Sequence, residues 1–193
     1  MAIKLQLFSA KDHQRLITWM ADADTLTLWS GSLFTHPLDE KQLAQHHRDD
    51  GHNLPPFRRI YKAVDNASGE VVGHVEISDI WPSLSGRISG VLVGEKSRRG
   101  QGAGEEIVTK AVELAARQFH VDRVDLAVLR QNAPAIRCYR KCGFVRVGSW
   151  PNAVNLPDGH ADIEWMTLFD VQSKVSNFRS TAPSLRREPT LHL

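Results

Sequence analysis

The sequence has no long hydrophobic run. Of its 193 residues, 41% are hydrophobic, yet no stretch approaches the about 18 to 20 consecutive apolar residues that a membrane span needs. The first segment, "MAIKLQLFSAKDHQRL", also lacks the apolar core and the cleavage site of a signal peptide. We therefore expect a globular protein with no membrane partner, located in the cytoplasm.

Cysteine is scarce as well. The only two, Cys138 and Cys142, lie four residues apart in a segment with helical character. No second cluster of histidine or cysteine completes a metal site, and two cysteines at this spacing give no disulfide framework. We expect both to be reduced residues packed near a helix, and we expect no bound metal ion.

No charge of one sign dominates the chain. The formal net charge is +2, and residues 171–193 carry four Lys or Arg against one Glu, which leaves residues 1–170 at −1. Proteins that bind nucleic acid usually present a concentrated basic face. The charge distribution therefore favours no nucleic-acid partner.

The length fits one domain with a full core. Alternating or continuous apolar patterns predict strands at 3–8, 59–64, 71–80, 87–95, 123–129, 144–150 and 162–169. Helical periodicity or capping signals predict helices near 9–20, 24–30, 39–50, 105–119 and 132–142. This order predicts an α/β (α+β) domain over residues 1–170, with a mixed sheet covered by helices on both faces. Residues 171–193 lose periodicity and are expected to form a flexible basic tail.

The segment "RRGQGAG" at residues 98–104 joins a strand to a helix. Several backbone N–H groups then point at one spot, with the positive end of the helix dipole behind them. The three glycines allow close approach of phosphate oxygens, and Arg98 and Arg99 add positive charge. The spacing matches neither the Walker loop nor the dinucleotide fingerprint. Either a pyrophosphate cradle or an ordinary packing turn would explain the loop taken alone.

A second motif follows about 30 residues later, at "NAPAIRCYRKCGF". Together the two motifs resemble the GNAT superfamily of N-acetyltransferases, in its branch of ribosomal-protein and small-amine acetyltransferases. The match is Arg99-x-x-Gly102-x-Gly104 after the strand Val91-Leu92-Val93, then Asn132-x-x-Ala135-x-x-x-Tyr139-x-Lys141-x-Gly143-Phe144. It is close over residues 88–147. The resemblance implies a GNAT-like, mostly antiparallel sheet over the whole domain.

The resemblance also implies acetyl-CoA as the cosubstrate. Its pyrophosphate would lie on the backbone amides of the loop, its pantetheine arm along the preceding strand, and Asn132 would contact it from the next helix. The residues implied to bind it are Val91, Leu92, Val93, Arg98, Arg99, Gly100, Gln101, Gly102, Ala103, Gly104, Asn132, Ala135 and Tyr139.

Amine acetylation requires one group to remove a proton from the amine and another to protonate the departing thiolate. The resemblance places Tyr139 as that general acid. Some members carry a glutamate as base where this sequence has Ala127. Two other candidates for the base, Glu76 and His74, share one strand face because they are two residues apart. Each could also be an ordinary strand residue.

The amine itself is not evident. The segment 22–56 is expected to vary with the acceptor, and its Trp29 could shape a pocket or pack in the core. Four acidic residues could line a polyamine site or merely keep the surface soluble: Asp22, Asp24, Asp39 and Glu40. We expect an enzyme acting on an unspecified primary amine. The alternative is a catalytically silent CoA-binding sensor or interaction module, and a homodimer is possible in either case.

Overall fold

In the computed structural model, residues 2–48, 58–156 and 159–180 are described. Their strands are β1 (Ile3–Leu7), β2 (Arg58–Asp65), β3 (Val71–Trp81), β4 (Ser85–Val93), β5 (Arg123–Leu129), β6 (Val145–Leu156) and β7 (Gly159–Leu168). Their helices are α1 (His13–Trp19), α2 (Ala23–Ser30), α3 (Glu40–Arg48), α4 (Ala103–Phe119), α5 (Ala133–Lys141) and α6 (Val171–Ser180), with short 3₁₀ turns at Ala10–Asp12 and Lys96–Arg98. Within these residues, no helix combines the length and apolar character required to cross a bilayer.

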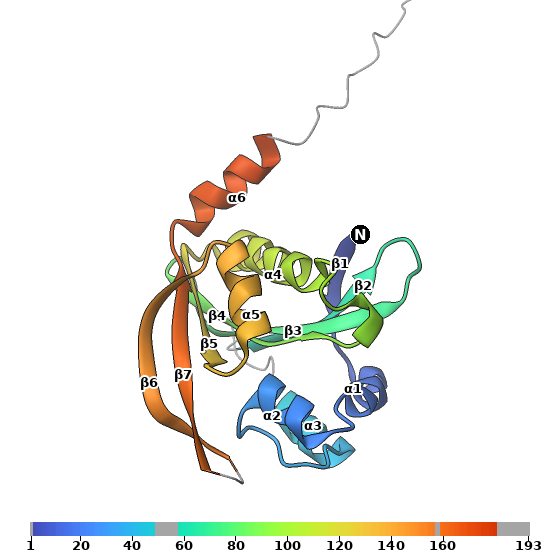
Figure 1. Ribbon diagram of the computed structural model, residues 1–193. Coiled ribbons are helices and arrows are strands. Elements are labelled where there is room, and N and C mark those ends of the chain that lie inside the picture. Colours follow the sequence, from blue (N-terminus) through green and yellow to red (C-terminus); the bar gives the residue numbers. More distant parts are fainter. Residues whose placement is uncertain (1, 49–57, 157–158, 181–193) are drawn as a thin grey trace, which may run out of the picture.

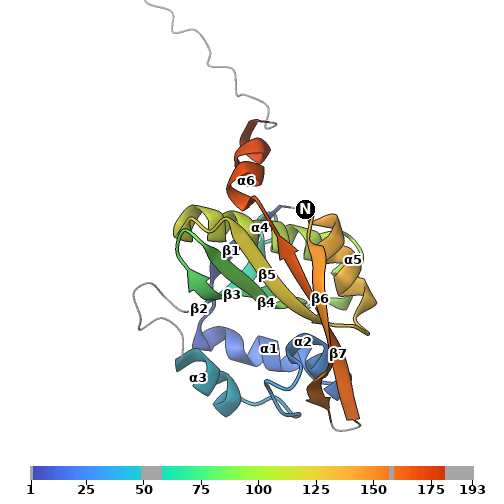
Figure 2. The same ribbon diagram turned by 90° about the vertical axis from the view of Figure 1, so that its left-hand side faces the viewer.

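The strands form a single seven-stranded sheet in the order β1-β2-β3-β4-β5-β7-β6. Every neighbouring pair is antiparallel except β4 and β5, which run parallel. Helices α4 and α5 cover one face of the sheet, and α1, α2 and α3 lie on the other (Figures 1 and 2). The prediction of a mixed, mostly antiparallel sheet between two layers of helices is therefore confirmed.

The sheet is split in its middle. Strand β4 pairs with β5 only from Ser85–Arg123 to Arg87–Asp125, and the later residues of the two strands have no mutual pairing. Strand β4 is also irregular against β3, because Gly90 and Val91 lie opposite a single residue between the pairs His74–Leu92 and Glu76–Ser89. Such a bulge bends a strand and leaves a ladder position free. The split therefore opens a space between two strands that would otherwise be joined.

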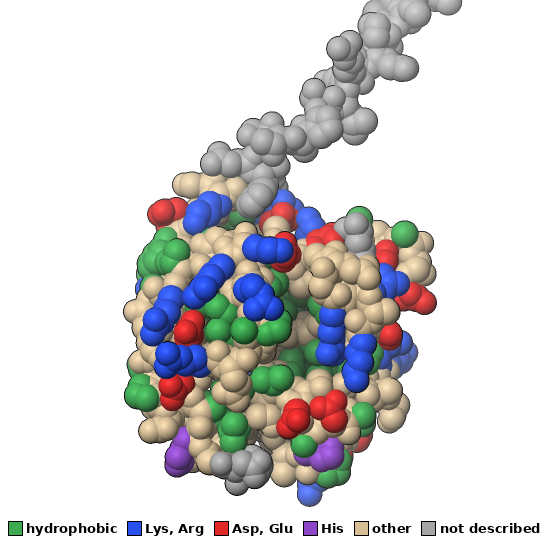
Figure 3. Space-filling view, in the orientation of Figure 1, with side chains coloured by type: hydrophobic (Ala, Val, Ile, Leu, Met, Phe, Trp, Pro, Cys, Tyr) green, Lys and Arg blue, Asp and Glu red, His purple; other side chains and the backbone are tan. Residues whose placement is uncertain are grey.

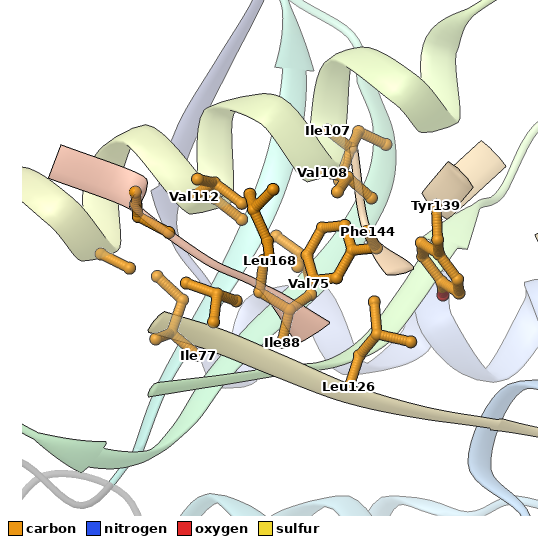
Figure 4. Packing of buried hydrophobic residues seen from close by; sticks show 14 of the residues in the cluster. Val75, Ile77, Ile88, Ile107, Val108, Val112, Leu126, Tyr139, Phe144 and Leu168 are labelled. Carbon is orange, nitrogen blue, oxygen red and sulfur yellow. The ribbon is translucent and has the colours of Figure 1, made fainter. Parts of the chain in front are cut away.

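The main core lies between the sheet and α4. Figure 4 shows Ile107, Val108 and Val112 of α4 facing side chains of the central strands, with Phe144 among them and Tyr139 at one end. The α4 residues recur at helical spacing, as the sequence predicts, and all are almost fully buried. A smaller apolar cluster holds the other layer: Leu16, Met20, Leu26, Leu38, Leu43 and Leu92.

The predicted start of the C-terminal tail is wrong. Residues 171–180 form helix α6, whose Val171 and Val175 are buried against the main core. The side-chain amide of Gln172 also donates to the backbone oxygens of Ala116 (3.0 Å) and Val121 (2.9 Å). Two valines four residues apart share one helical face, which is enough to dock a short helix. Residues 181–193 lie outside the described part of the chain.

Candidate active site

The glycine loop leaves a row of backbone N–H groups without partners. Gly100 and Gly102 have φ values of +75° and +88°, in the region that favours glycine. A Cβ atom built on either residue would have no heavy atom within 4 Å, so the space beside the loop is open. Within the described part of the chain, the amides of residues 100–104 make no hydrogen bond. Helix α4 begins directly after them, so the loop has the geometry of an anion-binding cradle.

The cradle forms one wall of a cavity of about 560 Å³, called the larger cavity below. Its lining residues are Thr25, Leu28, Trp29, Val91, Leu92, Val93, Arg99, Gly100, Gly102, Gly104, Glu105, Asn132, Pro134, Ala135, Arg137, Cys138, Tyr139 and Lys141. Most of the residues expected to bind acetyl-CoA are among them. The end of β4, the loop and the start of α5 therefore meet around one space, as the two motifs predict.

Positive charge surrounds the larger cavity. Figure 3 shows Lys and Arg side chains on both sides of the hollow between α5 and residues 96–104. Within the described part of the chain, Arg99 and Arg137 have no carboxylate partner, and Arg99 Nε donates to the backbone oxygen of Val93 (2.9 Å). Glu105 also lines the cavity, but its charge is offset by Lys141 at 2.6 Å. Free amides, open glycines and unpaired cations fit the pyrophosphate of acetyl-CoA.

Three residues expected to bind acetyl-CoA lie outside this lining. The Arg98 guanidinium is bound to Asp65 (2.6 Å) and Glu70 (2.9 Å), so its charge is largely neutralised away from the cradle. The side chain of Gln101 donates to the backbone oxygen of Ser97 (2.6 Å), and Ala103 is buried in the main core. The amide of Arg99, also expected in the cradle, donates instead to the Lys96 oxygen (3.2 Å).

A second cavity of about 230 Å³ lies on the other side of Tyr139 and is called the smaller cavity below. Its lining residues are Leu28, Trp29, Ser30, Gly31, Leu33, Phe34, Glu76, Ile88, Ser89, Gly90, Val91, Ala127, Val128, Leu129, Asn132, Ala135, Tyr139, Val154 and Ile163. Six residues line both cavities: Leu28, Trp29, Val91, Asn132, Ala135 and Tyr139. The two spaces therefore share one wall, formed by α2, by Val91 of β4 and by α5 with its cap.

Tyr139 lies in that shared wall. Its ring packs beside Phe144 with the centroids 6.1 Å apart, and its hydroxyl points out of the core cluster (Figure 4). Among the described residues, the hydroxyl has no hydrogen-bond partner, and it is not sealed from solvent. Burial of the side chain, together with the nearby Cys138 and Cys142, raises the pKa of Tyr139 well above its usual value. The phenol therefore keeps its proton throughout the neutral range.

Asn132 carries out the local role that the sequence predicts. Its side-chain oxygen accepts a hydrogen bond from the Ala135 amide (3.2 Å) and so caps α5, which has Pro134 in its first turn. Its side-chain nitrogen donates to the backbone oxygen of Leu28 on α2 (3.4 Å). Asn132 thus joins the two helices that flank the shared wall.

Glu76 contributes a buried carboxylate to the smaller cavity. The His46 Nε2 atom lies 3.0 and 3.1 Å from its two oxygens, and Arg58 Nε lies 3.7 Å away. Arg58 Nη1 also lies 3.0 Å from His46 Nδ1. Because a guanidinium can only donate, Nδ1 accepts there and Nε2–H donates to Glu76. Burial alone would raise the pKa of Glu76, but the His46 hydrogen bond, followed by the electrostatic effect of the two histidines and Arg58, lowers it below its ordinary value.

His74 lies behind Glu76 rather than in the cavity wall. Its Nδ1 atom is 2.8 Å from the Gly90 oxygen, and its Nε2 atom is 3.9 Å from Glu76. The two residues therefore share a strand face, as their spacing predicts. Burial lowers the pKa of His74, which favours the neutral ring, although Glu76 and the Gly90 carbonyl act in the opposite direction.

His46 and His47 point different ways, as expected for neighbours on a helix. His47 Nδ1 lies 2.7 Å from His13 Nε2, and His13 Nδ1 lies 2.6 Å from Glu40. Burial, followed by the charges of His13 and the other histidines, lowers the pKa of His47. Within the described residues, no group of three His, Cys, Asp or Glu is arranged to hold a metal ion.

Three functional side chains escape the sequence motifs. His46 and Arg58 hold Glu76 but lie 30 and 18 residues before it, and no local pattern links them to it. Arg137 lines the larger cavity one helical turn before Lys141. The four-residue spacing of these two cations, inside the second motif, is the signal that could have identified Arg137.

The chain is similar to several known acetyltransferases. It is 25% identical over 177 residues to an aminoglycoside N(6')-acetyltransferase type 1 from Klebsiella pneumoniae, covering 83% of this chain and 80% of that protein. It is 29% identical over 91 residues to the L-amino acid N-acetyltransferase AaaT of Escherichia coli (strain K12). This second match covers 47% of the chain and spans only 54% of the relative's length.

A similar fold occurs in spermidine N-acetyltransferase from Vibrio cholerae, solved in complex with CoA and spermine. The TM-score is 0.73 at 18% identity, with 91% of this chain and 98% of that chain covered. At this identity the likeness concerns the fold. A family model described as the Acetyltransferase (GNAT) family matches residues 16–144, which is more than half of the sequence. The chain belongs to the GNAT acetyltransferase family.

Proposed function

We propose that the protein transfers the acetyl group of acetyl-CoA to a primary amine by direct attack. The observation that carries this proposal is the free Tyr139 hydroxyl in the wall shared by two cavities, one with an anion cradle and the other with a buried carboxylate. Acetyl-CoA supplies the activated thioester. The larger cavity would hold it through the amides of residues 100–104, with Arg99 and Arg137 beside them.

Glu76 and Tyr139 divide the proton transfers between them. An ammonium acceptor loses one proton before its nitrogen attacks and a second as the amide forms, while the departing thiolate gains one. One proton is therefore released overall. Glu76, directly or through water, receives the proton lost before attack. Tyr139 donates its proton to the sulfur as the C–S bond breaks and regains one from the nitrogen or from solvent.

The pKa directions fit these roles with a trade-off for each group. The raised pKa of Tyr139 keeps the donor protonated but makes it a weaker acid. The lowered pKa of Glu76 keeps it ionised, which suits contact with an ammonium, but makes it a weaker base. We therefore expect Glu76 to accept a hydrogen bond from the amine or a water, and Tyr139 to donate one to the thioester sulfur. In each hydrogen bond the proton moves across as charge develops on the nitrogen or the sulfur during the reaction.

Calorimetric titration of acetyl-CoA tests the cradle. Gly102→Asp places a side chain and a negative charge in open space beside the free amides. We expect affinity to fall at least about thirtyfold, or about 2 kcal/mol. Gly69→Asp is the matched control, because Gly69 also has a positive φ, +72°, and open space around its Cβ position, but lines neither cavity. Equal affinity in all three proteins would remove the cradle from the proposal.

A catalytically silent CoA binder remains the second candidate. It is favoured by Ala127 in the smaller cavity, where some family members carry a glutamate, and by the hold of Arg58 and His46 on Glu76. A thiol-release assay over a panel of amines separates the two functions. Acetyl-CoA binding without acceptor-dependent thiol release would favour the silent binder. The cytoplasmic location and the homodimer stay predictions, and size exclusion at several concentrations tests the dimer.

A further inference from the structure

The smaller cavity is poor in charge. Among its described lining residues, Glu76 is the only one that carries a formal charge at neutral pH. That carboxylate already has the Arg58 guanidinium at 3.7 Å and the His46 N–H at 3.0 Å. Because the Arg58 Nε atom lies beyond hydrogen-bond distance, the carboxylate oxygens of Glu76 can still accept from one ammonium group. A second ammonium in the same space would be desolvated without a partner, which is costly.

The remainder of the smaller cavity combines an apolar side with the uncharged polar side chains of Ser30, Ser89 and Asn132. Trp29 and Phe34 stack with their ring centroids 5.6 Å apart and their planes within 7°. Leu28 and Leu33 extend this surface outward, since their side chains are 41% and 59% exposed. Ile88, Val154 and Ile163 complete the apolar lining. Such a surface stabilises a hydrocarbon or aromatic body and supplies no second carboxylate for a further ammonium group.

The acidic residues that could have served a polyamine are engaged elsewhere. Asp22 accepts from the Thr25 amide (2.7 Å) and Asp39 from the Gln42 amide (2.8 Å), so each caps a helix. Glu40 is bound to the buried His13. Neither these three nor Asp24 lines the smaller cavity. The four-carboxylate polyamine site considered from the sequence is therefore not assembled at this cavity.

We infer that the smaller cavity takes its acceptor as a monocation, a primary amine with one ammonium group at Glu76 and an apolar alkyl or arylalkyl body along Trp29, Phe34 and Leu33. This rests on the proposed function and narrows it to a substrate class. The solved spermidine acetyltransferase has the same fold at 18% identity. Two proteins with the same fold can accept amines of different charge, because the choice of acceptor depends on the side chains that line the cavity.

A matched pair of amines tests the inference. Pentylamine and putrescine have the same number of heavy atoms, and putrescine replaces the terminal methyl of pentylamine by a second ammonium. We expect kcat/KM for thiol release to favour pentylamine at least about tenfold, and direct titration into the CoA-loaded protein to give the same order of affinity. Phenethylamine should be acetylated at least as well as pentylamine, and spermine no better than putrescine.

A substitution that adds a negative charge to the cavity tests the inference in the opposite direction, by favouring the diamine. Ala127→Glu adds a second carboxylate to the lining, and Ala127→Gln adds the same bulk without charge. We expect the glutamate variant alone to shift the kcat/KM ratio toward putrescine by at least about fivefold. Because the ratio compares two substrates of one protein, a general loss of activity does not alter its meaning.

The two hypotheses fail in different ways. If putrescine or spermine equals or exceeds pentylamine in binding and turnover, the monocation inference is overturned while amine acetylation stands. If pentylamine binds selectively but no amine releases thiol, the reaction fails while the monocation site stands. If no monoamine binds the CoA-loaded protein at millimolar concentration, the inference is overturned as well.

Discussion

The two cavities that meet at Tyr139 are built in different ways. Apart from Thr25, Leu28 and Trp29, the described lining of the larger cavity comes from residues 91–141, and its anion cradle consists of backbone amides. The smaller cavity draws on α2, β3, β4, β5, α5, β6 and β7, and its charged group is a side chain. One is a local backbone structure, and the other is assembled from distant side chains.

This difference fits the different functions that we propose for the two cavities. A cradle of amides before a helix offers phosphate groups hydrogen-bond donors whose positions are fixed by the backbone. The smaller cavity can change its acceptor through a few substitutions, because its contacts come from side chains on separate elements. Substitutions that change the backbone of the loop should therefore change the affinity for acetyl-CoA. Substitutions that remove long-range side-chain contacts should change kcat/KM for the amine.

The largest effect is expected at the residue that serves both cavities. Tyr139→Phe removes a hydroxyl but keeps the ring against Phe144. Loss of general acid catalysis should lower kcat at least about a hundredfold. Affinity for acetyl-CoA should change by less than about threefold, because the cradle is untouched. Steady-state thiol release and calorimetry measure the two quantities.

The protein contains a matched control for this substitution. Tyr61 is the only other tyrosine, and it is buried in the main core, where its hydroxyl donates to Gln118 (3.4 Å). Tyr61→Phe should cost about 1 kcal/mol of unfolding free energy and leave kcat nearly unchanged. Equal kcat values for both variants and wild type would remove Tyr139 from the chemistry.

The next effect concerns the layer of α1, α2 and α3 that forms one wall of the smaller cavity. Asp12 ties this layer to β2 through Lys62 Nζ at 2.9 Å and also accepts from the Ser9 amide at 3.0 Å. Because Asp12 is buried, Asp12→Asn should lower the unfolding free energy by about 2 kcal/mol in urea denaturation. Asp79→Asn breaks a partly exposed pair with Arg87 and should cost less than about 1 kcal/mol.

The same contact makes stability depend on pH. Burial would raise the pKa of Asp12, but hydrogen bonds from Lys62 and Ser9 and the charge of Lys62 lower it below the value of about 3.9 for a free aspartate. The stabilisation is therefore complete above that value and is lost as pH falls through the lower folded-state pKa. The gap between wild type and Asp12→Asn should narrow below about pH 4, and a constant gap would contradict this assignment.

The sequence predicts the larger cavity well because its determinants are local. Strand β5 is predicted with the bounds that the structure has, and α5 lies between Asn132 and Gly143 as its capping signals indicate. A cap, a proline in the first turn and a glycine at the end act within a few residues. The backbone conformation of the cradle follows from its glycines in the same way.

The sequence does not predict which partner a charged side chain finds. Arg98 sits in the glycine motif, yet it binds Asp65 and Glu70, which lie 33 and 28 residues earlier. Glu76 could be a solvated strand residue by pattern, and only the folded chain brings His46 and Arg58 to it. Helix α6 is not predicted because its contacts are few: two buried valines, Val171 and Val175, and the side chain of Gln172.

A moderate effect is expected at the group that holds Glu76. His46→Phe keeps a ring against Phe34 but removes the hydrogen bond to the carboxylate. The carboxylate should then be less well oriented, and kcat/KM for the amine should fall about tenfold. Because that hydrogen bond lowers the pKa of Glu76, its loss should move the acid limb of the kcat/KM profile to higher pH. Titration of acetyl-CoA should be unaffected.

A conservative replacement distinguishes orientation from simple packing. His46→Gln retains an N–H donor and should recover part of the lost activity and the original position of the acid limb. If the phenylalanine variant lowers kcat/KM without moving the limb, His46 supports the fold of α3 but does not tune Glu76.

The smallest effect separates the cap of α5 from a contact with acetyl-CoA. Asn132→Ala removes the acceptor for the Ala135 amide and should lower the unfolding free energy by about 1 kcal/mol. Asn132→Ser keeps a capping oxygen and should restore most of that stability, although its short side chain does not reach Leu28. The Asn132 side-chain oxygen already accepts the hydrogen bond from the Ala135 amide. We therefore expect the affinity for acetyl-CoA to change less than about threefold in both variants. If both variants lose affinity for acetyl-CoA while only the alanine variant loses stability, Asn132 contacts acetyl-CoA directly. The larger cavity would then bind acetyl-CoA through one side chain in addition to its backbone amides.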